Sequence, residues 1–123
     1  MAGPHSHIPD TAIIAEVRVL YRSPLMQQIR DAHRAANPTL IRIGKYSIQY
    51  EPHAFSGMTA FPHGFVVGKE AFASEDEFKK TLLHEVYRLS HSEIGRGGDA
   101  HQTSIRAESD AAFQFAERSC MLI

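Results

Sequence analysis

The strongest constraint on the fold of this chain is a helix signature that begins at Ser74. Ser74 and Glu77 form a capping box, in which each side chain satisfies a backbone N–H that the first helical turn leaves free. The two residues between them are acidic, which suits the positive end of the helix dipole. Apolar residues then recur at helical spacing as far as Ile94, and Gly95 is typical of a helix end. The sequence therefore predicts a long helix over residues 74–94.

This helix carries its reactive side chains on one face. At about 100° per residue, His84, Arg88 and His91 lie on the same side as Glu77. The opposite, apolar side is formed by Phe78, Leu82, Val86 and Leu89. Glu85 lies on the border between the two. A solvated face with ordinary ion pairs also explains Glu77, Arg88 and His91.

A second helix, predicted from about Ile105 to Ser119, adds a carboxylate in an unusual place. Glu108 shares one side of this helix with three apolar residues, namely Ala111, Ala112 and Phe115. An unpaired charge is costly on an apolar stripe, so Glu108 requires a partner. Two antiparallel helices joined by a short loop would bring it towards His84 or Arg88. The alternative is a buried Glu108–Arg88 ion pair that only fixes the helix packing.

The rest of the chain predicts another helix and a small sheet. Ser23 and Pro24 suit a helix start, followed by an apolar stripe of Leu25, Ile29, Ala32 and Ala36. Strands are expected at 40–43 and 45–50, joined by a tight turn at Gly44-Lys45, and the runs 58–61 and 65–67 suit further strands. Residues 12–22 fit either a helix or a strand. The element order predicts one α+β domain over residues 1–123, with residues 1–10 as a flexible N-terminal segment.

Composition excludes several classes of protein. The chain is 43% hydrophobic with a formal net charge of −1, so neither disorder nor nonspecific duplex binding is expected. Its one cysteine, Cys120, permits no intrachain disulfide, and no apolar run is long enough to span a bilayer. Residues 120–123 have the outline of a prenylation box, but packing of this apolar end onto the core is the favoured interpretation.

Residues 64–85, which end in His84-Glu85, resemble the passage from strand to active helix in small zincin metallopeptidases. That family carries HExxH on the helix, with two histidines as zinc ligands and the glutamate as base. The resemblance implies a zincin-like fold with His84 as a zinc ligand, Glu85 as the base and Glu108 as a candidate third ligand. The chain departs from the pattern at Arg88, which stands where the second histidine belongs and cannot bind zinc. His91 lies about 10 Å further along the helix axis and is a weak candidate ligand.

A longer stretch, from about Leu40 to Glu117, resembles C-terminal domains of bacterial Rhs-type polymorphic toxins. The resemblance rests on Phe55-Ser-Gly-Met-Thr, Phe65-Val-Val-Gly, Lys80-Thr-Leu-Leu-His-Glu and Phe115-Ala-Glu, together with Glu108. It implies an effector that is secreted or delivered into a target cell as the C-terminal part of a larger carrier. It also implies a macromolecular substrate in that cell and a cognate immunity protein as partner.

Three functions follow from these observations. The first is a peptidase-like hydrolase in which His84, Glu85, Arg88 and Glu108 form one site, with or without zinc. The second is a metal-independent ribonuclease toxin, in which His84 and Glu85 exchange protons and Arg88 holds the phosphate. The third is an inactive zincin scaffold that serves as a protein-binding module, for which Arg88 in a ligand position is the argument.

Overall fold

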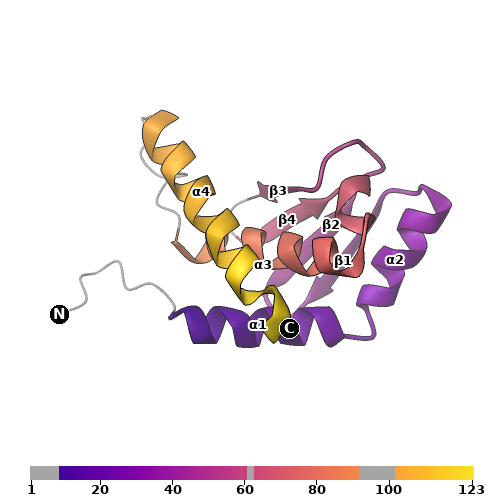
Figure 1. Cartoon of the computed structure of the whole chain (residues 1–123). Helices are drawn as coiled ribbons and strands as arrows, with labels where there is room; N and C mark the ends of the chain where they lie inside the picture. The colour runs from indigo at the N-terminus through magenta and orange to yellow at the C-terminus, as the bar shows by residue number, and fades with distance from the viewer. Residues whose placement is uncertain (1–8, 61–62, 92–101) are drawn as a thin grey trace.

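The structure is a computed structural model that describes residues 9–60, 63–91 and 102–123, except for the side chains of 102–108. Within this part of the chain, four α-helices accompany a four-stranded mixed sheet, which confirms the α+β prediction (Figure 1). The elements in order are α1 (Asp10–Arg22), α2 (Met26–Ala35), β1 (Thr39–Ile43), β2 (Tyr46–Tyr50), β3 (Gly57–Ala60), β4 (Gly64–Val67), α3 (Glu75–His91) and α4 (Gln102–Ser119), with short 3₁₀ turns at Lys69–Phe72 and Cys120–Leu122.

The sheet has the strand order β1-β2-β4-β3, so β4 lies between two strands that precede it in the sequence. β1 and β2 form the predicted antiparallel hairpin, and Gly44 makes the turn with a φ of 58° that favours glycine. β4 runs parallel to β2 and antiparallel to β3. Among the described residues β3 pairs with β4 alone, which makes it an edge strand.

One face of the sheet is covered by helices and forms the core. Alternate residues of β2 and β4 are buried on this face, as a half-buried strand requires: Tyr46, Ile48, Tyr50, Phe65 and Val67. α2 packs on β1 and β2, whereas α3 packs on β3 and β4 and against α1. α4 packs along α3 and crosses in front of it in Figure 1. The helix α3 is thus enclosed between β3 on one side and α4 on another.

The ambiguous residues 12–22 are helical and belong to α1. Ile13, Val17 and Leu20 are buried, whereas Val19 is 65% exposed, so the helical spacing decides the burial pattern. The helix starts at Asp10, inside the segment predicted to be flexible, and residues 1–8 of that segment lie outside the described residues.

The predicted stripe of α2 is correct in its middle and wrong at both ends. Ile29 and Ala32 are buried, but Leu25 precedes the helix and is 41% exposed, and Met26 takes the buried position. Ala36 ends the helix in a left-handed conformation with φ 54°, so it leaves the stripe and faces solvent.

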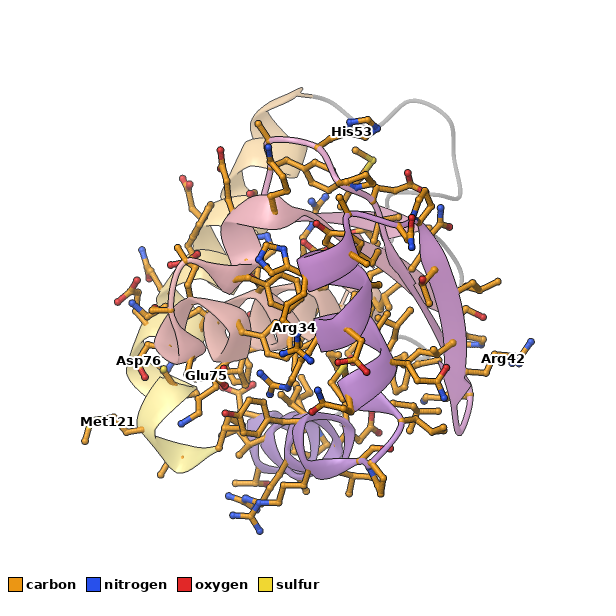
Figure 2. The ribbon with its side chains drawn as sticks, turned by 90° about the vertical axis from the view of Figure 1, so that its right-hand side faces the viewer. Arg34, Arg42, His53, Glu75, Asp76 and Met121 are labelled. Atoms are coloured by element: carbon orange, nitrogen blue, oxygen red, sulfur yellow. The ribbon has the colours of Figure 1, made fainter. Side chains whose placement is uncertain are left out.

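The Ser74 half of the predicted capping box is present at the start of α3. Ser74 Oγ accepts a hydrogen bond from the Glu77 backbone N–H at 3.0 Å. Glu75, labelled in Figure 2, accepts hydrogen bonds from the Tyr21 hydroxyl at 2.6 Å and from Arg30 at 2.7 Å. These bonds tie the first turn of α3 to α1 and α2. The described part of α3 ends at His91. The predicted helix end at Ile94 and Gly95 lies outside the described residues.

α4 begins at Gln102, three residues before the predicted start, and the C-terminus folds back onto α1. Cys120 is buried and the Arg18 guanidinium donates two hydrogen bonds to the Leu122 carbonyl, whereas Met121 is 94% exposed (Figure 2). The expectation of an apolar end that packs on the core is confirmed for Cys120 and Ile123. No helix within the described part of the chain has the length and apolar character to cross a membrane.

Candidate functional site

A pocket of about 210 Å³ lies at the junction of α3, α4 and the start of β3. α3 forms its floor, and Phe113 and Ala116 of α4 form an apolar wall. The remaining lining residues are Ser56, Gly57, Glu77, Lys80, Thr81, His84, Glu85 and Glu117. Helical phasing correctly placed Glu77 and His84 on one side of α3. His84 and Glu85, the pair singled out in the sequence, both line this pocket.

Glu85 is the most deeply buried charged residue described here, with 2% of its surface exposed. Its Oε1 accepts a hydrogen bond from the Thr59 hydroxyl of β3 at 2.7 Å. Its Oε2 lies against Gly57, where a Cβ would come within 2.8 Å. Burial raises the pKa of the Glu85 carboxyl, while the Thr59 hydrogen bond and the Arg88 charge oppose that rise. A carboxylate in this state is suited to accept a proton.

His84 is partly buried one residue before Glu85. Its ring meets the Phe113 ring of α4 edge to face, with 4.6 Å between ring centroids. Burial, together with the nearby Arg88 charge, lowers the pKa of His84 to about 4. Its Nδ1 atom is buried and has no hydrogen-bond partner among the described residues. The imidazole is therefore neutral at pH 7, as both a metal ligand and a neutral hydrogen-bonding group require.

Arg88 and His91 lie on α3 but are not among the residues that line the pocket. The Arg88 Nε is buried without a hydrogen-bond partner among the described residues, and the positive charge of Arg88 acts on both His84 and Glu85. His91 stacks on the ring of Tyr87 with 4.0 Å between centroids. The structure thus brings Arg88 to the site as a neighbouring cation and leaves His91 outside the pocket.

Glu108 lies within the bounds of α4, but its side chain is outside the described residues. Ala112 and Phe115, which belong to the predicted apolar stripe of this helix, are fully buried. The approach of Glu108 to His84 or Arg88 stays a prediction.

The described residues do not fit the zinc site that the zincin resemblance implies. In the parts of the chain that are described, no three His, Cys, Asp or Glu side chains are placed to hold one metal ion. Arg88 occupies the second ligand position and has no lone pair to offer. Zinc binding by His84 and Glu108 remains a prediction.

Sequence reasoning missed the contribution of β3 and the outer end of α4. Thr59 donates a hydrogen bond to Glu85, and Gly57 leaves room for its other oxygen. Lys80 forms an ion pair with Glu117 at 3.2 Å across the pocket mouth. Gly57 belongs to β3, one residue before the predicted strand 58–61, and no local pattern indicated which helix this strand meets.

No protein-family model, curated protein or solved structure matches the chain.

Proposed function

We propose that this chain is a hydrolase domain of the effector type, which cleaves a polypeptide in a target cell. The observation that carries the proposal is a neutral histidine next to a buried carboxylate in one pocket, His84 and Glu85. The effector role rests on the resemblance to Rhs-type toxin domains. That resemblance also implies delivery by a larger carrier and neutralisation by an immunity protein.

In the proposed reaction Glu85 is the general base. A water molecule attacks the scissile carbonyl carbon while its proton passes to the Glu85 carboxylate, and a tetrahedral oxyanion forms. Glu85 then returns the proton to the amide nitrogen, the C–N bond breaks, and the carboxylate is restored. Because burial raises its pKa, Glu85 is a stronger base than an exposed carboxylate.

His84 and Arg88 support the negative charge that develops on the oxyanion. His84 is neutral at pH 7 and lines the pocket, so its imidazole N–H is able to donate a hydrogen bond. Arg88 acts from just outside the pocket through its charge, which is felt strongly where burial lowers the effective dielectric. In the HExxH pattern a zinc ion supplies the positive charge that stabilises the oxyanion. In the proposed reaction the guanidinium of Arg88, at the position of the second histidine, supplies a positive charge beside the base.

The surroundings of the pocket favour a polypeptide over RNA. Among the described residues β3 pairs with β4 alone, and an extended peptide is able to pair with the outer edge of such a strand. Among its described residues, the pocket mouth carries the carboxylates of Glu77 and Glu117 and the cation of Lys80, which is paired with Glu117. Such a mouth offers little attraction to a phosphate backbone.

Inducible expression in bacterial cells tests the proposal. We expect the wild-type chain to stop growth while cellular RNA stays intact, and we expect His84→Ala and Glu85→Gln to abolish the effect. His53→Ala is the matched control, because this histidine is 71% exposed and does not line the pocket. Degraded RNA would favour the ribonuclease reading, and growth arrest by both site variants would remove this pocket from consideration.

Metal analysis of the purified protein tests the predicted zinc separately. Stoichiometric zinc that is lost in His84→Ala would support the ligand role of His84. A wild-type protein that is active and free of zinc would leave the acid–base scheme as the only form of the hydrolase proposal.

A further inference from the structure

The edge strand β3 makes two direct contacts with the proposed base, and the proposed reaction assigns it no role in catalysis. The Thr59 hydroxyl donates to Oε1 of Glu85 at 2.7 Å. The other oxygen, Oε2, lies so close to Gly57 that a Cβ there would stand 2.8 Å from it. Thr59 thus binds one carboxylate oxygen, and the missing side chain of Gly57 leaves room for the other.

Sheet register explains why these two residues face Glu85. Thr59 pairs with Phe65 of β4 and Gly57 pairs with Val67, and both partners are buried on the helix-covered face. Side chains at positions two apart share a face, so Gly57 and Thr59 point towards α3 while Met58 and Ala60 are exposed. The Thr59 hydroxyl thus stands on the face where the neighbouring strand β4 presents the apolar side chains of Phe65 and Val67.

The hydroxyl of Thr59 is the one hydrogen-bond donor to Glu85 among the described residues. Glu85 is 2% exposed, and Oε1 lies on the side of the carboxylate that meets β3, so water is a poor substitute for Thr59 as the donor to this oxygen. Without the Thr59 hydroxyl, Oε1 would be left unsatisfied and the side chain would turn towards another donor. The positive charge of Arg88, on the same helix, already acts on Glu85.

We propose that Thr59 is a positioning residue for Glu85, which fixes the carboxylate so that the free Oε2 faces the pocket. Gly57 completes the arrangement by leaving room for that oxygen. The β-branched Thr59 side chain has few rotamers and sits on a paired strand, so its hydroxyl is held in place before substrate binds. The effect on activity rests on the proposed hydrolase function, whereas the effect on Glu85 does not.

Other groups around Glu85 are able to compete for its carboxylate when the Thr59 bond is lost. Among the described residues these donors lie on α3 and are Lys80, His84 and Arg88. The other described charges of the site are the carboxylates of Glu77 on α3 and Glu117 on α4, which repel an ionised Glu85. β3 contributes no titratable side chain here.

The order of the Glu85 side chain measures positioning directly and needs no substrate. We would record NMR relaxation of the Glu85 γ-methylene group in the wild type, Thr59→Val and Thr59→Ser. Thr59→Val keeps the shape and removes the hydroxyl, and we expect it to lower the order parameter. Thr59→Ser keeps the hydroxyl and should retain the wild-type value. Thr59→Ala serves in place of Thr59→Val if that variant does not fold.

Thr39→Val is the matched control. Thr39 lies on β1, the opposite edge of the sheet, and its hydroxyl donates only to the Asn37 carbonyl at 3.3 Å. Thr39→Val should leave both the order parameter of the Glu85 side chain and growth inhibition at their wild-type values. Thr59→Val should reduce the rate of substrate cleavage roughly 10- to 100-fold, because a small displacement of a catalytic group has an effect of this size.

The two proposals fail in distinguishable ways. If the wild-type chain cleaves no polypeptide, the hydrolase proposal fails, but the relaxation experiment still tests the role of Thr59. If Thr59→Val leaves the order of Glu85 at the wild-type value, the positioning role is overturned whether or not the chain is a hydrolase.

Discussion

Gly57 is the position where one added methyl group perturbs the proposed base most directly. A Cβ there would lie 2.8 Å from Glu85 Oε2 and 2.9 Å from Thr81 Cγ2. Both contacts are too short, so β3 must move away from α3 or Glu85 must turn. Overpacking of this kind destabilises a protein by about 1–3 kcal/mol, and the lower flexibility of alanine in the unfolded chain offsets about 0.4–1 kcal/mol. We therefore expect Gly57→Ala to lower the free energy of unfolding by about 1–2 kcal/mol.

Gly44→Ala is a control with a similar loss of stability and no contact with the site. Gly44 has a φ of 58° and nothing within 4 Å of its Cβ position, so only backbone strain of about 1–2 kcal/mol is expected. Thermal unfolding followed by circular dichroism should show a decrease of roughly 5 °C for both variants. Growth inhibition should be lost in Gly57→Ala alone. Equal inhibition by both variants, or a Gly57→Ala protein as stable as the wild type, would refute the close contact between β3 and Glu85.

Three further predictions concern charge in the pocket. Burial and the Arg88 charge lower the folded-state pKa of His84 from 6.5 to about 4, so the wild type should lose stability relative to His84→Asn as the pH falls from about 6.5 to 4. Urea unfolding at several pH values measures this loss, and parallel curves for the two proteins would contradict it. Burial raises the pKa of Glu85, so its ionised form opposes folding at neutral pH and protonation relieves the penalty as the pH falls. Glu85→Gln should therefore raise the melting temperature at pH 7 more than at pH 4. A Glu85→Gln melting temperature below that of the wild type at pH 7 would contradict a folded-state penalty for the ionised carboxylate. The Lys80–Glu117 ion pair is 3.2 Å long and Glu117 is 65% exposed, so Lys80→Ala should hardly change the melting temperature. A decrease as large as that of Gly57→Ala would show that the pair holds α3 and α4 together.

Local sequence patterns were sufficient to predict the elements that form the floor of the pocket. The capping box placed the start of α3, and helical phasing put Glu77 and His84 on one side with Glu85 at the border. These features depend on residues within a few turns of one another, so the sequence expresses them directly. The burial of Glu85 agrees with its position beside the apolar arc.

The partners of Glu85 depend on contacts distant in sequence. Thr59 and Glu85 are 26 positions apart, and they meet only because β4 inserts between β2 and β3 and moves β3 to the edge beside α3. No local pattern specifies that strand order. The same limit applies to Arg88, because its position outside the pocket depends on how the pocket forms between α3, α4 and β3. Helical phasing predicts which side of a helix a residue lies on, but it does not predict which other elements pack against that side.

The most direct test of the central claim is a survey of new peptide termini in cells that express the chain. Labelling of free N-termini followed by mass spectrometry would compare the wild type with Glu85→Gln at equal protein levels. We predict new termini in cells that express the wild type and none above background in cells that express Glu85→Gln. The absence of new termini in growth-arrested wild-type cells, or the same termini with Glu85→Gln, would contradict a hydrolase with Glu85 as its base.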